Sequence, residues 1–399
     1  MDLLIGGVSS LHDPLLAAAL RGCGFDATAL PTPRDEDLEV GRALLPRATP
    51  NPGLYLVGAV LRQLGEMARA RGVSVAEAAS RSALVCVSGR YFHHASQHRE
   101  AWRAAGIDAL PTLDLEFGRV DPIVALSTRL RAPVARVTRA LLTAVATGDA
   151  LLLAGCEARA RWMDAPVDEA LSHHRDRCVT ALESGVAPWS SLAALPTALR
   201  GVTSREGPPV RVRVTGDFFA SMTDGDGGDG VLRQLGARGA RVSPATLSEW
   251  VSLWRWRAAR GADGDARRRL ERVDSVLRTL HRRATTAAGV SAPFADIDDL
   301  ASLAAAHYPT ELLDAPGFVE AGHLLAAARD RSADLVVSLK PFATTPSSAV
   351  SDALMHALSQ RTDTDFLSIE TNGDARAQVA SRLDLALDLA AERLRVSGR

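Results

Sequence analysis

Short apolar runs alternate with segments of helical period along most of this 399-residue chain. The run at 83–88, ALVCVS, is almost wholly apolar, which is typical of a strand buried on both faces of a sheet. Parallel strands need a long crossover connection that is usually a helix, so this alternation favours parallel sheets covered by helices. The sequence therefore predicts the α/β fold class.

The same pattern predicts three regions. Residues 1–125 form a first α/β domain, with strands at 3–8, 27–30, 83–88 and 109–113 and helices at 14–21, 54–70 and 96–105. Residues 126–205 form a helical connecting region that ends near a Gly-, Ser- and Pro-rich linker at 201–209. Residues 206–399 form a second α/β domain with a helical insertion at about 246–330. Its expected strands are 210–219, 241–243, 333–339 and 365–370, and its expected helices are 230–237, 347–360 and 375–394.

Charge and cysteine usage exclude several classes of protein. The formal net charge is −1, with 46 Lys+Arg and 47 Asp+Glu, which argues against nucleic-acid or anionic-membrane partners. We expect no membrane span and no signal peptide, because no long apolar stretch and no basic N-terminal segment stand out. The four cysteines, at 23, 86, 156 and 178, have no Cys-x-x-Cys spacing and predict no disulfide framework. A cytoplasmic protein is expected.

Two long segments carry a family resemblance. Residues 335–374, LVVSLKPFATTPSSAVSDALMHALSQRTDTDFLSIETNGD, and residues 212–254, which begin VRVTGDFF and contain an acidic Gly-Asp-Gly loop, are the most similar. They resemble the 2-hydroxyacyl-CoA dehydratase and CoA-activase superfamily, in particular its activase-associated component. Members of that component usually read Pro-Phe-Gly-Cys-Met-Pro, and the Cys ligates an iron–sulfur cluster. Here Thr344 stands in the Cys position of Pro341–Pro346.

Two other expected cluster positions are also substituted. A Cys-Tyr-Pro-Cys-like element of the family falls at Pro50–Gly53, and a Gly-Pro-Cys-Arg-Phe-Gly element places its Cys at Gly89 and its Arg at Arg90. A hydroxyl does not replace a thiolate at iron, so we expect no iron–sulfur cluster and no other cofactor. One alternative stays open, in which Cys86 and thiols of a partner hold a cluster together.

Seven residues are candidates for ligand binding: Gly89, Arg90, Asp217, Asp226, Thr344, Thr345 and Ser347. The guanidinium of Arg90 can grip a carboxylate or phosphate, and the hydroxyls beside Pro346 can hold an anion at a helix N-terminus. The structural alternatives are an internal ion pair for Arg90 and Asp217, and ordinary helix capping for the hydroxyls. Candidates for catalysis are Arg90, Asp217, Thr344 and Glu370.

Other motifs are better explained structurally. The Gly-x-Gly-x-x-Gly spacing at 225–230 carries aspartates that repel a pyrophosphate, so it does not predict a dinucleotide site. The pairs His94–His98 and His174–Cys178 have i,i+4 spacing but no further ligands, and we expect no metal site. The sequence contains no Gly-x-Ser-x-Gly element, so no motif in it supports a serine hydrolase. The tryptophans at 250, 254 and 256 favour a helix packed on the core.

These observations predict two Rossmann-like (flavodoxin-like) domains whose parallel sheets face each other across a cleft. The turns at 88–90, 215–217 and 340–345 are expected to line it. The first hypothesis is a cluster-less accessory or ligand-binding member of the superfamily. It would bind a small anionic or CoA-thioester ligand, or form a homo- or hetero-oligomer with a dehydratase or activase-type subunit. The alternative is an enzyme that does redox-free acid/base chemistry on a thioester or carboxylic acid. Whether the protein is an enzyme stays open.

Overall fold

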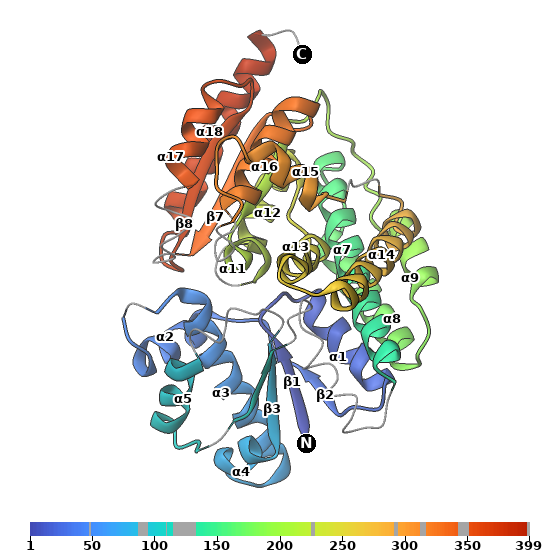
Figure 1. The fold of residues 1–399 in the computed structure, drawn as a ribbon, viewed down its shortest axis with the longest axis vertical. Coiled ribbons are helices and arrows are strands. Elements are labelled where there is room, and N and C mark those ends of the chain that lie inside the picture. The colour runs from blue at the N-terminus through green and yellow to red at the C-terminus, as the bar shows by residue number, and fades with distance from the viewer. Residues whose placement is uncertain are drawn as a thin grey trace.

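The computed structural model describes residues 1–47, 49–86, 95–108, 110–114, 133–224, 228–290, 294–311, 317–341 and 351–396. The fold is mixed α/β with two four-stranded sheets, and every strand pairing in them is parallel, as the alternating pattern predicted (Figure 1). The first sheet has the order β2-β1-β3-β4, from β1 (Asp2–Gly6), β2 (Ala27–Ala29), β3 (Ser82–Cys86) and β4 (Thr112–Asp114). The second has the order β6-β5-β7-β8, from β5 (Arg211–Gly216), β6 (Arg241–Ser243), β7 (Leu335–Pro341) and β8 (Asp365–Thr371).

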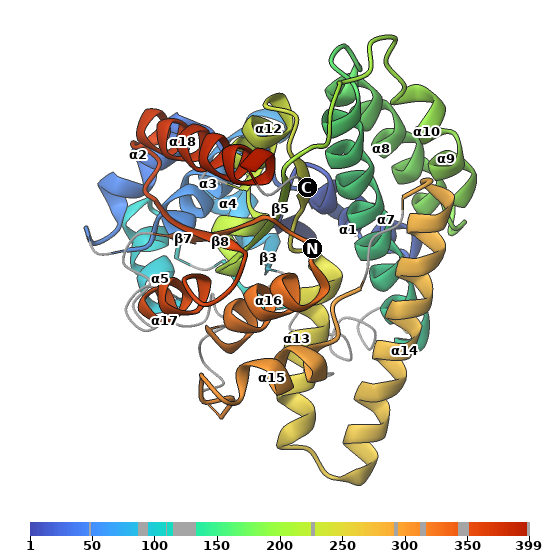
Figure 2. The same ribbon diagram turned by 90° about the horizontal axis from the view of Figure 1, so that it is seen from above.

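Helices surround both sheets. Those that accompany the first sheet are α1 (His12–Gly22), α2 (Asp35–Leu44), α3 (Asn51–Arg71), α4 (Val75–Ser80) and α5 (Ala95–Ala104). The helical region contains α7 (Val134–Arg161), α8 (Val167–Glu183), α9 (Trp189–Ala193) and α10 (Leu195–Ala198). The remainder are α11 (Phe218–Met222), α12 (Gly228–Ala237), α13 (Leu247–Arg260), α14 (Gly264–Ala287), α15 (Ile297–Ala304), α16 (Gly317–Asp330), α17 (Asp352–Ser359) and α18 (Arg376–Val396). Figure 2 shows α7, α8, α9, α10 and α14 gathered on one side of the molecule.

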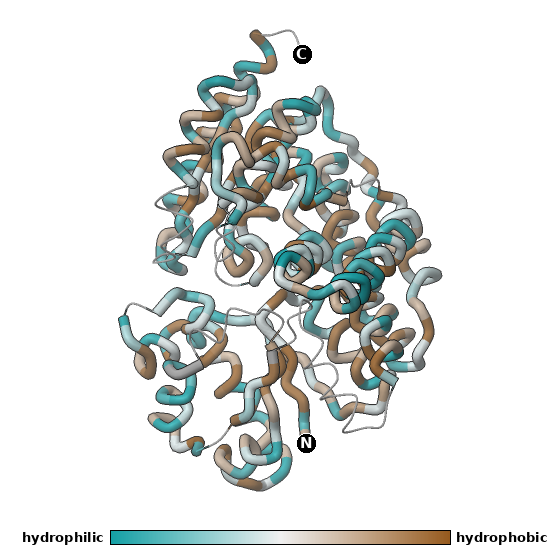
Figure 3. Tube along the Cα trace, in the orientation of Figure 1, coloured by the Kyte–Doolittle hydropathy of each residue, from teal (hydrophilic) through white to brown (hydrophobic). Residues whose placement is uncertain are grey.

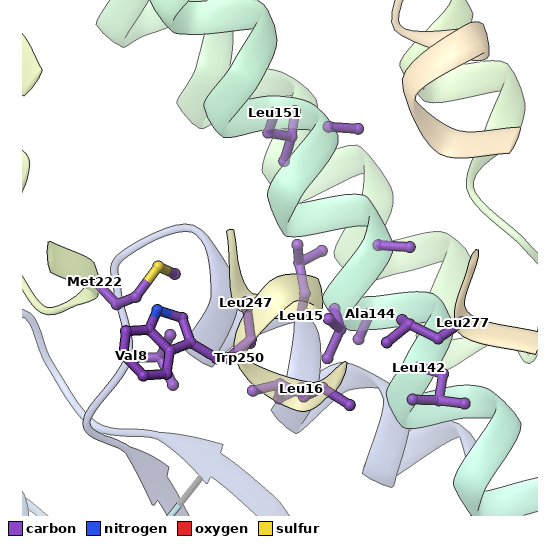
Figure 4. Packing of buried hydrophobic residues seen from close by; sticks show 14 of the residues in the cluster. Val8, Leu15, Leu16, Leu142, Ala144, Leu151, Met222, Leu247, Trp250 and Leu277 are labelled. Carbon is purple, nitrogen blue, oxygen red and sulfur yellow. The ribbon is translucent and has the colours of Figure 1, made fainter. Parts of the chain in front are cut away.

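The largest core lies around α7. Leu15 and Leu16 of α1 lie beside Ala144 of α7 and Leu247 of α13 (Figure 4), and all four are fully buried. Helix α7 does reach the length and apolar composition of a membrane span, contrary to the sequence expectation, but 78% of its most apolar window is buried inside the molecule. A core helix of a water-soluble fold passes the same test. Figure 3 shows that the two central strands of the first sheet, β1 and β3, are also predominantly apolar.

Each sheet reverses its strand order once. The reversal lies between β1 and β3 in the first sheet and between β5 and β7 in the second. In open parallel sheets, ligands bind at the carboxyl ends of the strands beside such a reversal. The segments that follow β1 and β5 contact each other, because the Ser10 backbone N–H donates to the Asp224 carboxylate. At the start of α3, the Asn51 side chain lies 3.5 Å from the carbonyl oxygen of Thr371, the last residue of β8.

Two details of the expected elements are wrong. The strand expected at 210–219 ends at Gly216, whose φ of +121° turns the chain. Asp217 then accepts a hydrogen bond from the Phe219 backbone N–H at 3.0 Å and begins α11. A side chain at Gly216 would place its Cβ 2.1 Å from the Leu339 carbonyl oxygen, so the turn depends on glycine there. Helices α2 and α4 were not expected at all.

Candidate functional site

The chain between β1 and α1 folds into a short strap, residues 7–11, that is held by side chains of its own. Gly7 has a φ of +96°, which lets the chain turn directly after the buried strand. The Ser9 hydroxyl oxygen accepts hydrogen bonds from the backbone N–H groups of Leu11 and His12, at 3.3 and 3.2 Å. The Asp13 carboxylate accepts from the Val8 N–H at 3.3 Å. The strap is therefore a fixed turn at the carboxyl end of β1.

A cavity of about 210 Å³ opens beside this strap. One wall is apolar and comes from the turn after β2 and from α3, including Leu30, Pro31 and Leu56. The polar lining comes from the strap, α1, α3, α8 and the segment before α12. It includes Ser9, Ser10, Asp13, Tyr55, Arg175 and Asp224. The cavity thus joins residues from all three regions of the chain.

Two carboxyl groups and one guanidinium set the charge of this cavity. Burial raises the pKa of Asp13 well above its ordinary value; the Val8 N–H lowers it in part, and the nearby Asp224 raises it further. Asp13 can therefore be a neutral hydrogen-bond donor at a pH where an ordinary aspartate is ionised. Arg175 lies at the strap with Nη1 3.3 Å from the Ser10 carbonyl oxygen, while its other nitrogens bind the exposed Asp176.

Beneath the strap, Ser9 begins a buried chain of polar groups. Its hydroxyl oxygen lies 2.8 Å from His12 Nδ1, and His12 Nε2 lies 3.1 Å from an Asp149 oxygen. Asp149, in the middle of α7, is fully buried and also accepts from the backbone N–H groups of Leu247 and Ser248, at 2.8 and 3.0 Å. Burial by itself raises the pKa of Asp149, but the hydrogen bonds from His12 and His281 outweigh it and hold that pKa below its ordinary value.

A second buried group lies at the carboxyl end of β7. Lys340 is the only lysine in the sequence and is fully buried. Its Nζ lies 3.2 Å from Glu320 Oε2 and contacts the Asp352 carboxylate. Burial raises the pKa of Glu320 to about 7, although Lys340 and the Ser338 hydroxyl act in the opposite direction. A sole lysine at a strand end was a signal that the sequence already contained.

The structure places few of the residues that the sequence singled out. Gly89, Arg90, Asp226, Thr344, Thr345 and Ser347 lie outside the described residues. Asp217 is buried and caps α11, and its backbone N–H donates to the Leu339 carbonyl oxygen at 2.7 Å, directly before Lys340. Glu370 is exposed on β8, and its backbone pairs with that of Lys340. Of the predicted site residues that the structure describes, the Asp217 backbone therefore lies against the end of β7, and the Glu370 side chain lies at the surface.

Other expectations met different outcomes. His94 lies outside the described residues, whereas His98 is buried on α5. In the other pair, the ring of His174 contacts the Ser191 carbonyl oxygen at 2.8 Å, and burial raises the pKa of the Cys178 thiol to about 12. Among the described residues there is no group of three or more potential metal ligands. The core packing of the tryptophan helix is confirmed, since Trp250 and Trp254 are buried against Phe218.

Sequence reasoning missed Ser9, His12, Asp13, Asp149 and Arg175. A weak signal was present, because Gly7-Val8-Ser9 follows an apolar strand, although Leu11 stands where a nucleophile elbow has its second glycine. Asp224 belongs to the acidic loop that the sequence did single out. In comparisons with known proteins, no family model and no curated protein matches this chain.

Proposed function

We propose that this protein binds a small acyl compound or carboxylic acid in the cavity beside the strap, as a cluster-less, ligand-binding member of the superfamily that its sequence resembles. In this proposal the two parallel sheets form two Rossmann-like domains, residues 1–125 and 206–399, that face each other across a cleft. The observation that carries it is the cavity at the carboxyl end of β1, which is lined by residues from the first, connecting and second regions.

The lining of the cavity suggests the class of ligand. Leu30, Pro31 and Leu56 offer an apolar wall of a size suited to a short hydrocarbon chain. Arg175 is the cation among the described lining residues and suits a carboxylate or a polarised carbonyl oxygen. A neutral Asp13 adds a hydrogen-bond donor. An intact CoA thioester is far larger than about 210 Å³, so only its acyl end would enter.

A second candidate function is acid/base chemistry on the same ligand, without redox chemistry. It is favoured by the paired carboxyl groups of Asp13 and Asp224 in one cavity, one of which has a strongly raised pKa. A carboxyl group with a strongly raised pKa, next to a second carboxyl group, is a common arrangement for a general acid and a general base. Both candidates use the same cavity, so binding is the first property to test.

Thermal-shift and calorimetric titration with short-chain carboxylates, their amides and CoA thioesters tests the binding proposal. A ligand specific for the native state raises the melting temperature by mass action. Replacing Arg175 by Ala should weaken binding by about 1.5–3 kcal/mol, the scale of a charge-assisted hydrogen bond. Arg177→Ala is the matched control, since Arg177 is an exposed residue of the same helix outside the cavity. No shift with any compound, or equal loss in both variants, would overturn the proposal.

The absence of a cluster is a separate part of the proposal. Protein purified without oxygen should be colourless, because Pro50, Gly89 and Thr344 offer no thiolate. Iron and sulfide analysis together with native mass checks this, and also tests for an oligomer. A brown sample with about four iron atoms per chain would contradict it.

A further inference from the structure

Ser9, His12 and Asp149 form a continuous line of hydrogen-bond partners that starts at the cavity. Ser9 is half-buried and lines the cavity, His12 is fully buried one turn further on, and Asp149 is contributed by a different helix. The two links are 2.8 and 3.1 Å long. A hydroxyl, an imidazole in contact with it and a third group that orients the imidazole are the parts of an activated nucleophile.

The partners of His12 indicate which ring nitrogen carries the hydrogen when the imidazole is neutral. Asp149 is held by two backbone N–H groups of α13 and stays a carboxylate, so it accepts a hydrogen bond from His12 Nε2. We therefore assign the hydrogen of the neutral ring to Nε2 and the free electron pair to Nδ1. Nδ1 is the atom that lies 2.8 Å from the Ser9 hydroxyl oxygen. The hydroxyl then donates its hydrogen to the imidazole, as a serine nucleophile must.

The His12 imidazole packs against α7 at Gly148, where only glycine leaves enough space for the ring. A Cβ atom at Gly148 would lie 2.3 Å from His12 Cδ2 and 2.6 Å from Nε2. Glycine within a helix costs roughly 0.5–1 kcal/mol relative to alanine, so its presence here is unfavourable unless the space is needed. Gly148 directly precedes Asp149, and together they fix both the position of the imidazole and the direction of its hydrogen bond.

The geometry points to Ser9 as a nucleophile that accepts an acyl group from a small ester or thioester bound in this cavity, which makes the protein an acyl hydrolase. This inference rests on the proposed binding function of the same cavity. Asp149 acts through His12 and is a positioning residue, whereas Ser9 and His12 contact the reacting atoms. Arg175, at the strap, is the described cation that can approach the developing oxyanion.

The reaction needs no redox partner. Ser9 Oγ attacks the carbonyl carbon while its proton moves to His12 Nδ1, which gives a tetrahedral oxyanion. The carbon–oxygen or carbon–sulfur bond to the leaving group then breaks, and His12 returns the proton to the departing alcohol or thiol. Water attacks the acyl-serine, gives one proton to His12 and releases the acid, and that proton returns to Ser9. The sum is an ester or thioester plus water giving an acid plus an alcohol or thiol.

A fluorophosphonate probe, with p-nitrophenyl acetate as a turnover substrate, tests this assignment. The wild-type protein should gain one adduct that maps to the peptide containing Ser9, and should hydrolyse the ester. Ser9→Ala and His12→Gln should each lower the labelling rate at least 100-fold. Ser74→Ala is the matched control, because Ser74 also caps a helix, with its hydroxyl oxygen 3.1 Å from the Glu77 N–H, but lies outside the cavity. Circular dichroism shows whether each variant folds.

The outcomes separate the two proposals. Labelling that maps to Ser9 and is lost with Ser9→Ala but kept with Ser74→Ala supports the nucleophile. Absent labelling of a folded wild-type protein, or labelling that survives Ser9→Ala, overturns it, and Ser9 is then a helix cap. If a carboxylate still raises the melting temperature in that case, the binding function stands alone. If no compound shifts it and no probe reacts, both proposals are wrong.

Discussion

Two fully buried carboxyl groups in this protein, Asp149 and Glu320, have opposite ionisation behaviour. Asp149 receives four donors, from two backbone N–H groups and two imidazoles, and its pKa is lowered. Glu320 receives the Ser338 hydroxyl and Lys340 on Oε2, whereas Oε1 has no hydrogen-bond partner among the described residues, and its pKa is raised to about 7. Burial is the same at both sites, so the pKa values are separated by the hydrogen-bond donors and by neighbouring charges, among them Asp352, which raises the pKa of Glu320 further.

The first test of this comparison removes the charge at Asp149. Asp149→Asn replaces the carboxylate by an amide, so the backbone N–H groups and imidazoles that donate to it lose a charged acceptor. We expect the free energy of unfolding to fall by about 3–5 kcal/mol, as when one partner of a buried ion pair is removed. Urea denaturation measures it. Asp168→Asn is the control, because the Asp168 side chain is 60% exposed and its ion pairs with Arg159 and Arg233 should be worth at most about 1 kcal/mol. Equal costs for the two variants would show that the buried network contributes no more than a surface pair.

The second test uses the pH dependence that Glu320 predicts. Its pKa rises from an ordinary value of 4.5 to about 7 on folding, so the folded state binds the proton more tightly. The stabilisation from this group is fully present below pH 4.5 and is lost as pH rises through about 7. At 1.36 kcal/mol per pKa unit, the loss is about 3 kcal/mol.

Glu320→Gln should remove that slope from the curve of unfolding free energy against pH. The difference between wild type and variant isolates the contribution of Glu320 from those of other groups, such as Asp13, whose pKa is also raised by burial. Glu77→Gln, at an exposed helix pair with Arg81, is the control and should change the free energy of unfolding by less than about 1 kcal/mol. A variant as pH-dependent as the wild type would mean that Glu320 keeps an ordinary pKa.

A smaller change in the free energy of unfolding is expected at Gly148, where the His12 imidazole packs against α7. Gly148→Ala brings a Cβ into contact with the His12 ring, and overpacking of this kind costs about 1–3 kcal/mol. Gly65→Ala is the matched control, since Gly65 also lies within a helix but has nothing within 4 Å of its Cβ position. It should stabilise the protein by roughly 0.5–1 kcal/mol. Thermal unfolding of the two variants shows whether Gly148→Ala lowers the melting temperature while Gly65→Ala raises it. Stabilisation by both changes would contradict the close contact between Gly148 and the His12 ring.

The smallest effect is expected at the surface ion pairs that connect the regions. Arg376 bonds Asp35 and Arg42 bonds Asp374, and the side chains of Arg376 and Asp35 are more than 60% exposed. Arg376→Ala should change the free energy of unfolding by less than about 1 kcal/mol, and less still at high salt. Denaturation at two salt concentrations measures this. A loss as large as that of Asp149→Asn would mean that the contact between the regions depends on exposed charges.

Local sequence patterns predicted most of the strands, because a run of consecutive apolar residues indicates a buried strand. The strand at 241–243 was predicted with its observed bounds, and β2, β3 and β8 agree to within two residues. Helix α2 was missed because only Asp37, Leu38 and Gly41 of its ten residues are buried. Its apolar residues therefore show only a weak helical periodicity. It is held instead by close packing on α3, where Cβ atoms at Gly41 and Gly58 would meet backbone within 2.2 Å.

The sequence by itself determined the α/β class, the parallel sheets and the helical middle region, because these follow from periods of hydrophobicity within short windows. Only the tertiary structure brought Ser9 and His12 to Asp149, since His12 and Asp149 lie 137 residues apart. It likewise placed Asp224 beside Ser10, 214 residues away. No local pattern encodes such contacts. They form because α1, α7 and α13 bury their apolar faces on one another, and a carboxylate enclosed in that core must find donors wherever the packing supplies them.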